Sequence, residues 1–524
     1  MAIEVIPRSP PRERSAERTG ARAWPGLVAV IALVPLLLSL PFAAEPMEQD
    51  EGVYFTVARH GWPYGDVFDH KPPLIYGWYK LALLISAGQP SIEGVRVLAA
   101  LGFSIAALAV TWTGITLVDR RTGVIAGLLT GLAATNQYLQ PNANSEVFML
   151  VPLTLSLAAF VRAWRVQSLP WYAVAGALAA AAAMTKSVAL LHLLVLAGLP
   201  CWAAAVGLQQ WRAALRASFV VASAGALTIT AIAAPFVLAG RGGEFWYANV
   251  TYNIAYGAQL GFEDKLFALG EVDRRVIVAG LYLWVPAAAG LALLWRNGAT
   301  MASAVVVSGA MAAFAGASMT GREYPHYLVP IVPFAALAAA HAYDRMAASW
   351  HSTRARLHSE ALMLALVVPA IFAVVPLYVL DIEDVHLRKY NNGPNAQRAI
   401  ANEAIAQRLR ELPVEERTLF VLGDDAQLYP LSGFTPVTYH IRPVSDRAVD
   451  AGTWARTIEE LRAAPPAVII DAARIEAGVA LLSRTPHTVT LDIAPADRAA
   501  FDAFLAKGYE RVDDLAYASI WIRR

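Results

Sequence analysis

The chain has 524 residues, of which 57% are hydrophobic and only 16% charged, and its formal net charge is +1. This composition excludes a disordered chain, and the single cysteine, Cys201, excludes a disulfide scaffold. The near-neutral charge and the lack of a basic stripe also argue against binding of nucleic acid, which needs a basic surface to contact the phosphates.

The charged residues are distributed unevenly along the chain. Residues 381–524 carry 21 Asp and Glu and 17 Lys and Arg, whereas residues 1–380 carry only 45 charged residues. The last quarter therefore has the composition of an ordinary soluble protein. The first three quarters have that of a polytopic membrane protein.

Eleven apolar runs are long enough, or nearly so, to cross about 30 Å of hydrocarbon as helices. A signal peptide is the alternative for the first run, but the stretch from Pro25 to Ala44 is longer than a typical signal core, and Phe42 fits a cleavage site poorly. We therefore expect an uncleaved first helix. The predicted spans are 25–44, 95–118, 122–139, 145–163, 171–186, 187–207, 217–239, 275–295, 300–319, 326–342 and 360–380.

The placement of basic residues orients these spans. If the Arg-rich segment 1–24 is cytoplasmic and eleven helices alternate, every inner loop carries arginine, as the positive-inside rule requires. The first outer loop, residues 45–94, is acidic instead, and the tail 381–524 lies outside. The apolar stretch 73–90 is predicted as a juxtamembrane helix, because a twelfth span there would invert every later loop. The inner arginines are Arg120, Arg121, Arg162, Arg165, Arg212, Arg216, Arg296, Arg345, Arg354 and Arg356.

Once the chain is oriented, its unusual polar residues fall on the outer face. Ionisable groups at membrane depth are costly and indicate function by default. A structural role is the alternative for several: Lys186 and Arg322 could extend to the headgroups, and Glu146 could be a helix-start carboxylate. An acidic pair followed by a basic cluster and a rigid Pro-Pro is harder to explain in that way. The candidates are Asp50, Glu51, His70, Lys71, Glu146, Lys186, Arg322, His326 and Tyr327.

Familiar motifs of soluble enzymes are absent from the sequence. It has no Walker loop, no HExxH, no GxSxG and no zinc-ligand spacing. ATP and nucleotide sugars are scarce outside the cell. An activated donor used on the outer face would therefore come with the membrane, as a lipid phosphate.

Three segments of the first outer loop carry a resemblance to a known family, namely Asp50-Glu51-Gly52-Val53-Tyr54, Tyr64-Gly65-Asp66 and Asp69-His70-Lys71-Pro72-Pro73. They resemble the first outer loop of the GT-C glycosyltransferases, especially the protein O-mannosyltransferase and lipid A aminoarabinose transferase group. The similarity continues through Asn144-Ser145-Glu146, Met184-Thr185-Lys186 and 322–330 into the tail at 420–433.

The resemblance implies a polytopic GT-C fold with an extracytoplasmic α/β domain in the bacterial inner membrane. It also implies an inverting transfer of a sugar from a polyprenyl-phosphate-linked donor to a hydroxyl of an envelope glycan, lipid or protein. Asp50 maps to the family's general base, and Lys71 maps to a lysine associated with the donor phosphate. Val53 and His70 replace the Arg and Glu of the aminoarabinose transferases, and Glu146 replaces a frequent Asp. These departures bear on the sugar and the acceptor.

The chemistry of the residues agrees with this reaction. A carboxylate can take the acceptor's proton, and cations must stabilise the phosphate as it leaves. Asp50 and Glu51 are the candidate catalytic residues. Glu51 and Glu146 either orient the acceptor or the cations, or bind a divalent metal such as Mg²⁺ or Mn²⁺, and the sequence leaves these roles open. The expected cations are Lys71, His70, Lys186 and Arg322. The further substrate-binding candidates are His326, Tyr327, Tyr54 and Asp66.

The roles of the loop 241–273 and of the tail stay open between alternatives, as does the function of the whole chain. The aromatic loop 241–273 either closes over the lipid donor or lines the interface. In the tail, we predict a helix at 395–412, buried strands at 418–423 and 467–471, a helix around 501–507 and strands within 509–523. The tail shows no catalytic constellation, so it either recognises the acceptor or acts as a structural cap. The rival functions are a secondary transporter of an envelope precursor and a non-catalytic membrane scaffold.

Overall fold

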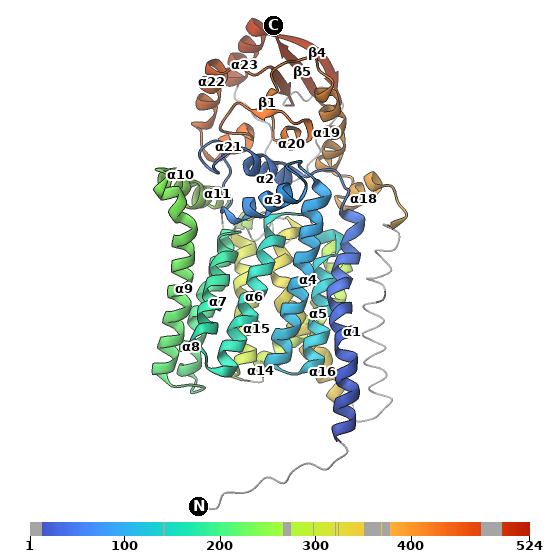
Figure 1. Cartoon of the computed structure of the whole chain (residues 1–524), viewed down its shortest axis with the longest axis vertical. Coiled ribbons are helices and arrows are strands. Elements are labelled where there is room, and N and C mark those ends of the chain that lie inside the picture. The colour runs from blue at the N-terminus through green and yellow to red at the C-terminus, as the bar shows by residue number, and fades with distance from the viewer. Residues whose placement is uncertain are drawn as a thin grey trace, which may run out of the picture.

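A computed structural model describes residues 13–139, 142–261, 263–265, 274–296, 298–319, 321–322, 324–349, 368, 378–472 and 495–524. The predicted span 360–380 lies almost wholly outside these residues. The described part is a bundle of long helices with a smaller α/β domain on one end (Figure 1). We call that end of the bundle the domain end.

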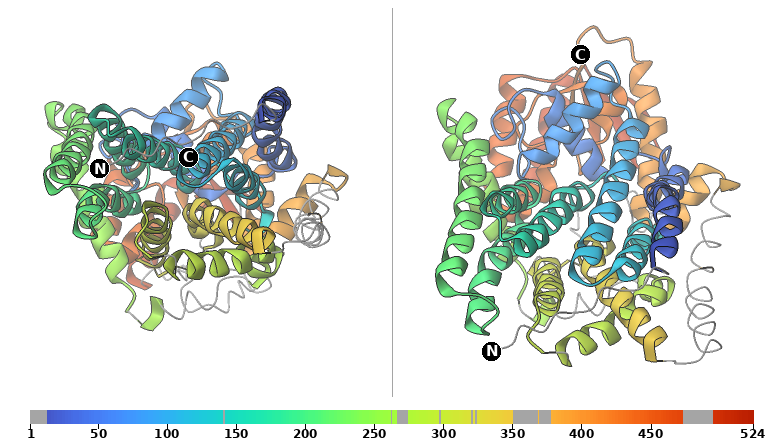
Figure 2. Two further views of the ribbon diagram at one scale, coloured as in Figure 1. Left: turned by 90° about the horizontal axis from the view of Figure 1, so that it is seen from below. Right: turned by 60° about the horizontal axis from the view of Figure 1, so that its bottom comes forward.

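Seven helical segments are long and apolar enough to cross a membrane, which makes the chain a multi-pass membrane protein in its described part. Each predicted span within the described residues coincides with helix. The bundle consists of α1 (Glu13–Ser39), α4 (Ile92–Leu117), α5 (Arg120–Ala134), α6 (Ser145–Val166), α7 (Leu169–Ala183), α8 (Leu190–Ala205), α9 (Trp211–Leu238), α13 (Arg274–Ala279), α14 (Leu281–Arg296), α15 (Met301–Met319) and α16 (Val332–Ser349). Seen from below, these helices stand roughly side by side (Figure 2).

Two short helices of the first long loop lie between the bundle and the C-terminal domain (Figure 1). They are α2 (Gln49–Arg59) and α3 (Leu74–Ile85). Twelve residues of α-helix extend only about 18 Å, too short to cross the hydrocarbon core. The structure thus places the stretch 73–90 as expected, at the end of the bundle and not across it.

Irregular backbone interrupts the helices near the domain end. α7 ends at Ala183, and Met184 to Lys186 turn before a 3₁₀ segment (Ser187–Ala189) leads into α8. A second 3₁₀ segment (Pro325–Ile331) precedes α16, where Pro330 cannot donate a helical hydrogen bond. These breaks carry Lys186, His326 and Tyr327 to the domain end.

The C-terminal domain contains one five-stranded sheet in the order β2-β1-β3-β5-β4. The central strands β1 and β3 are parallel, and β5 runs antiparallel to β3 and β4. The predicted tail elements are present. The strands are β1 (Thr418–Leu422), β2 (Thr435–Pro436), β3 (Val468–Asp471), β4 (Tyr509–Leu515) and β5 (Ala518–Arg523), and the helices are α18 (Ile382–Lys389), α19 (Pro394–Arg410), α20 (Leu428–Ser432), α21 (Pro443–Val449), α22 (Thr453–Ala463) and α23 (Pro495–Gly508).

The domain packs tightly against the first long loop. One continuous cluster of buried apolar side chains runs from the bundle into the domain. At Gly52 of α2, a Cβ atom would lie 2.4 Å from the Cα of Gln427 beside α20, so no larger residue fits there. The backbone N–H of Phe68 donates to the carbonyl of Tyr439 at 2.8 Å. The domain and the loop therefore form a single packed layer over the bundle.

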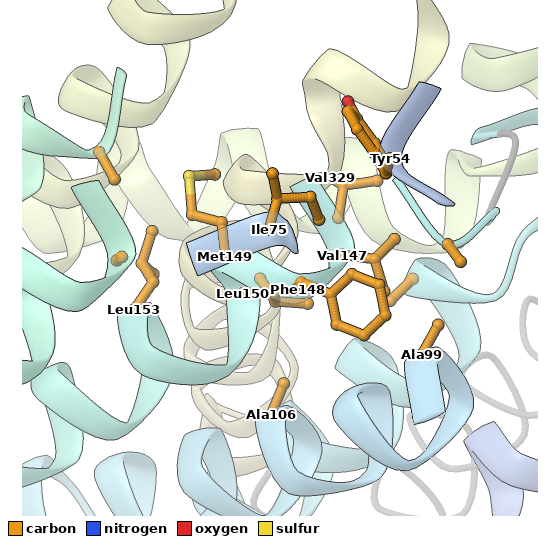
Figure 3. Close-up of a cluster of buried hydrophobic side chains, with 14 of the residues drawn as sticks. Tyr54, Ile75, Ala99, Ala106, Val147, Phe148, Met149, Leu150, Leu153 and Val329 are labelled. Atoms are coloured by element: carbon orange, nitrogen blue, oxygen red, sulfur yellow. The ribbon is translucent and has the colours of Figure 1, made fainter. Parts of the chain in front are cut away.

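The apolar core beneath this layer comes from several helices. Figure 3 shows Val147, Phe148 and Leu150 of α6 packed with Ile75 of α3 and side chains of α4. Tyr54 lies at the edge of the cluster with its hydroxyl directed away from it (Figure 3). The core thus ends where the polar groups begin.

Candidate active site

Asp50 and Glu51, the predicted acidic pair, lie in the first turn of α2 and face different directions. Glu48 caps this helix in a reciprocal capping box with Glu51. Asp50 keeps a side chain that is 36% exposed, and its Oδ2 accepts a 3.3 Å hydrogen bond from the hydroxyl of Tyr54. The positive end of the helix dipole favours a carboxylate here. Asp50 is thus oriented and open to a substrate.

Glu51 is fully buried, and both of its carboxylate oxygens accept hydrogen bonds. It accepts hydrogen bonds from Arg96 Nε and Nη2 at 3.0 and 2.7 Å, and another from the backbone N–H of Ala143 at 3.0 Å. Arg96 also donates to three carbonyls before α2, those of Phe42, Glu45 and Pro46. Glu51 therefore holds α2 in place, and we assign it a positioning role instead of the catalytic role expected from the sequence.

This assignment predicts a stability defect for Glu51→Ala. Removing one partner of a buried ion pair costs about 3–5 kcal/mol, because the remaining charge is left uncompensated. We expect a large fall in the thermal unfolding midpoint of the detergent-solubilised protein. The double variant Glu51→Leu/Arg96→Met, which removes both charges, should recover part of this loss. A Glu51→Ala protein that unfolds like the wild type would contradict the assignment.

Lys71 lies where the first long loop enters α3. Its carbonyl accepts hydrogen bonds from the hydroxyls of Tyr64 and Tyr76 at 2.5 and 3.2 Å, and Pro72 and Pro73 restrict the backbone that follows. Burial disfavours the charged ammonium, but Asp50, Asp69 and Glu146 outweigh this and raise the pKa of Lys71. Among the residues that the structure describes, no carboxylate lies within 4 Å of its Nζ.

His70 is a neutral neighbour of Lys71. Burial and the nearby lysine lower the pKa of His70 below its ordinary value. The Nζ of Lys71 lies 3.2 Å from Nε2 of the ring, which places the ring proton on Nδ1, 3.3 Å from Asp69 Oδ1. His70 thus orients Lys71, and this environment does not favour the cationic role expected for it.

Asp69 and Arg442 complete this group, and sequence reasoning assigned a role to neither. Arg442 belongs to the C-terminal domain and donates to Asp69 Oδ1 at 3.0 Å and to Asp50 Oδ1 at 3.3 Å. The hydroxyl of Tyr76 donates to the other oxygen of Asp69 at 2.9 Å. Burial alone would raise the pKa of Asp69, but His70 and Arg442 hold it well below its usual range. The domain therefore contributes directly to the site.

The buried Glu146 and Lys186 form a second group with the half-buried His326 and Tyr327. Lys186 donates to Glu146 Oε1, and Nε2 of His326 lies 3.7 Å from the same oxygen. The Nζ of Lys186 sits 4.0 Å above the ring of Tyr327, in cation–π geometry. The structure thus brings together three segments that the sequence only suggested belonged on the same side.

The aromatic loop 241–261 forms one wall of the site. It contains α10 (Gly242–Trp246), a π-helical turn (Tyr247–Thr251) and α11 (Tyr252–Ala258). The ring of Tyr252 stacks on His70 at 5.1 Å, and Asn253 donates to the carbonyl of His70 at 2.8 Å. Arg322 lies over the ring of Tyr256 and donates to Gln259. The loop thus contacts the site, and closure over the lipid donor or lining of the interface both stay predictions.

Asp66 lies outside this cluster. It accepts a hydrogen bond from the backbone N–H of Trp62 at 2.8 Å and one from Arg241 at 3.3 Å, and its side chain is 45% exposed. Its contacts stabilise a surface turn and its link to α10. We therefore leave Asp66 out of the proposed site.

A narrow apolar groove runs from the second group into the bundle. Its volume is about 20 Å³, and Glu146, Lys186 and Tyr327 stand at its polar end. Apolar and small side chains line the rest, and the space between them holds about one water molecule. These residues are Met149, Leu153, Val188, Ala189, Gly309, Ala312, Ala313, Gly316, Ala317, Pro330 and Phe334, with His192 among them.

The carboxylates do not converge as metal ligands. No group of three or more His, Cys, Asp or Glu side chains suited to a metal ion occurs among the described residues. Arg96 binds Glu51, and Lys186 binds Glu146, so these two candidates face cations instead of each other. We derive no step through Mg²⁺ or Mn²⁺.

Comparison with solved structures identifies the fold. ArnT from Cupriavidus metallidurans, bound to undecaprenyl phosphate, matches with a TM-score of 0.60 and 15% identity, over 96% of this chain and 98% of that one. The expected GT-C fold is confirmed. At this identity the likeness concerns the fold alone.

Two archaeal structures match over a smaller share of their own length. The Archaeoglobus fulgidus oligosaccharyltransferase with a tethered acceptor peptide has a TM-score of 0.57 and 12% identity, over 86% of this chain and 69% of that one. AglB from Archaeoglobus fulgidus, in complex with an inhibitory peptide and a dolichol-phosphate, has a TM-score of 0.55 and 11% identity, with coverages of 86% and 70%. No family model and no curated protein matches the sequence.

Proposed function

We propose that the protein is an inverting glycosyltransferase that uses a polyprenyl-phosphate-linked sugar and transfers the sugar to a hydroxyl of an envelope acceptor. One observation carries this proposal above the others: the partly exposed Asp50 and the half-buried Lys71 interact electrostatically with each other and with Lys186, which stands at the polar end of an apolar groove. Transfer from a lipid phosphate needs these three features together, a base, a cation and an apolar channel.

In the proposed reaction, the acceptor oxygen attacks C1 of the sugar from the side opposite the phosphate. As the C1–O bond to phosphate breaks, Asp50 accepts the acceptor's proton. Lys71 stabilises the charge that develops on the departing polyprenyl phosphate. The products are the glycosylated acceptor and the polyprenyl phosphate, and Asp50 then releases its proton.

Lys186 and Arg322 are further candidates for contact with the donor. Lys186 stands at the polar end of the groove, where the head of a lipid would meet it. Glu146, His326 and Tyr327 hold its ammonium in position. The groove is narrow, so a prenyl chain requires its lining side chains to move apart. The ligands of two proteins with this fold, undecaprenyl phosphate in ArnT and a dolichol-phosphate in AglB, support a polyprenyl phosphate here.

We further propose that the domain end is extracytoplasmic and the opposite end cytoplasmic. α6 begins beside the site at Ser145, so Arg162 and Arg165 lie near its far end. Arg120 and Arg121, at the start of α5, and Arg296, at the end of α14, lie at turns of the same far end. This distribution follows the positive-inside rule.

The direct test uses the purified protein in nanodiscs with undecaprenyl phosphates that carry different single sugars, together with an extract of envelope acceptors. We expect one donor to be consumed, with release of undecaprenyl phosphate. If no donor is consumed but a lipid-linked sugar crosses the bilayer intact, the transporter hypothesis replaces this one.

Lys71→Ala should impair use of the donor. Loss of one group that stabilises a developing oxyanion costs about 10²–10³-fold in rate. We expect a fall of that size in kcat/KM for the donor with little change in KM for the acceptor. Because the pKa of Lys71 is raised, its ammonium stays charged below its ordinary value of about 10.4. The deficit should therefore be constant from about pH 6 to 9 and shrink only at higher pH.

The matched control is Lys507→Ala, which removes an exposed lysine of α23 and should leave both constants unchanged. A Lys71→Ala enzyme with an unchanged kcat/KM for the donor would exclude the phosphate role.

A further inference from the structure

A second pocket lies between the aromatic loop and the C-terminal domain, away from Asp50. Glu244 and Tyr247 form one wall, and Tyr439, Asp450, Thr453 and Arg456 form the other. Its volume of about 580 Å³ is within the range of small-molecule sites. We call this cavity the domain pocket.

The lining of the domain pocket is polar and aromatic. The hydroxyl of Tyr247 donates to Asp450 at 2.6 Å, and the guanidinium of Arg456 lies 3.7 Å from the ring centroid of Tyr439. The side chain of Thr453 is only 1% exposed, and its hydroxyl has no hydrogen-bond partner. This hydroxyl is itself inaccessible, so the groups open to a ligand are those of the exposed Glu244 and Arg456 and of the half-buried Tyr247 and Asp450.

These groups fit a sugar better than an anion or an apolar ligand. A saccharide combines apolar C–H faces, which can lie against tyrosine rings, with hydroxyls that donate to carboxylates and accept from guanidinium or hydroxyl groups. Glu244 and Asp450 outnumber Arg456, the one Lys or Arg side chain among the lining residues, so a phosphate would meet net repulsion. Gly243, also in the lining, has open space where a Cβ atom would lie.

The domain pocket shares a wall with the active site. His440 lines the pocket and pairs with Asp446 at 2.9 Å. Asp446 in turn accepts a hydrogen bond from Tyr252 at 3.1 Å, and Tyr252 stacks on His70. Arg442, two residues after His440, contacts Asp50. One layer of side chains therefore separates the pocket from the reacting groups.

On these grounds we propose that the domain pocket binds a saccharide unit of the acceptor, away from the hydroxyl that is glycosylated. Calling this saccharide the acceptor rests on the proposed transferase function, whereas saccharide binding in the pocket does not depend on it. If the pocket binds a sugar unit away from the reacting hydroxyl, the acceptor is a glycan with more than one sugar residue.

The test is saturation-transfer NMR with the full-length protein in nanodiscs and the methyl glycosides of mannose, glucose, galactose and arabinose as probes. We expect saturation transfer to at least one glycoside, and affinity at least tenfold weaker in Gly243→Trp. A Cβ at Gly243 meets nothing within 4 Å, so the indole can extend into the pocket without displacing the backbone. Gly508→Trp, at an equally open position of α23, is the matched control and should bind normally.

Two results would overturn the proposal: no saturation transfer to any glycoside, or equal binding by wild type and Gly243→Trp. The binding assay uses no donor, so it is independent of the transferase reaction. Glycoside binding without donor consumption in the nanodisc assay would reject the transferase and retain the pocket.

Discussion

Asp50→Asn should reduce sugar transfer by about 10²–10⁴-fold, the range that general-base catalysis contributes. The amide keeps the shape of the carboxylate and its contact with Tyr54 but cannot accept the acceptor's proton. The protein should still insert and fold, because Asp50 is partly exposed and its bond to Arg442 is long, at 3.3 Å. The measurement is the release of polyprenyl phosphate under single-turnover conditions, with the thermal unfolding midpoint recorded in parallel.

The matched control is Asp384→Asn, the same change at an exposed carboxylate in the first turn of α18. It should transfer sugar at the wild-type rate. Asp50→Asn protein that turns over within a few-fold of the wild type would remove Asp50 from the role of general base.

Arg442→Gln should impair transfer through the position of Asp50, not through the donor. The guanidinium bridges Asp50 and Asp69, so its loss frees the orientation of Asp50 and leaves the buried Asp69 with less compensation. We expect kcat to fall by about 10²-fold, as misplacement near 1 Å does, with a smaller change in donor KM. The variant should also be less stable, by about 3–5 kcal/mol at most.

A pH profile separates positioning from general destabilisation. Arg442 helps to hold the pKa of Asp69 below its usual range, so in the wild type Asp69 stays ionised as the pH falls and loses its charge only at strongly acidic pH. Without Arg442 this pKa rises, and the acid limb of the rate profile should move to higher pH. An unshifted acid limb with lower amplitude would indicate a structural role only.

The matched control for Arg442 is Arg447→Gln in α21. Arg447 pairs with Asp497 at 3.1 Å on the surface, a contact worth at most about 1 kcal/mol. Its loss should leave both rate and profile unchanged.

The elements that could be predicted from the sequence are those with local signals. Apolar length predicts the spans, and arginine placement predicts a consistent orientation. The short run around Leu74–Ile85 could be predicted to lie outside the bundle core, because a twelfth crossing conflicts with every later loop. Asp50 and Lys71 could be singled out because their loop combines acids, bases and prolines at unusual density. The motif that carries the family resemblance lies in the same loop.

The different roles of Asp50 and Glu51 could not be predicted without knowing where α2 begins, because that sets the direction in which each side chain points. Consecutive residues of an α-helix point about 100° apart, so Asp50 and Glu51 cannot both face the site once α2 begins at Gln49. The partner of Glu51, Arg96, lies 45 residues away in a helix that otherwise reads as an apolar span. No local pattern in the sequence says that this arginine is the partner of Glu51.

Arg442 could not be singled out for a different reason. It is one of 17 Lys and Arg residues in a tail with ordinary soluble composition, and nothing nearby in the sequence marks it. Only the packing of the domain onto the first long loop, through contacts such as Gly52 with Gln427, brings it to Asp50. The same packing creates the domain pocket.

The central claim is that the protein moves a sugar from a polyprenyl phosphate to an envelope acceptor. The most direct measurement is mass spectrometry of lipid-linked sugars and envelope glycans from cells that carry wild-type protein, Asp50→Asn or no protein. We predict that one polyprenyl-phosphate sugar accumulates in both deficient strains and that one envelope glycan lacks the corresponding residue. Identical lipid-linked sugars and glycans in all three strains would contradict the claim.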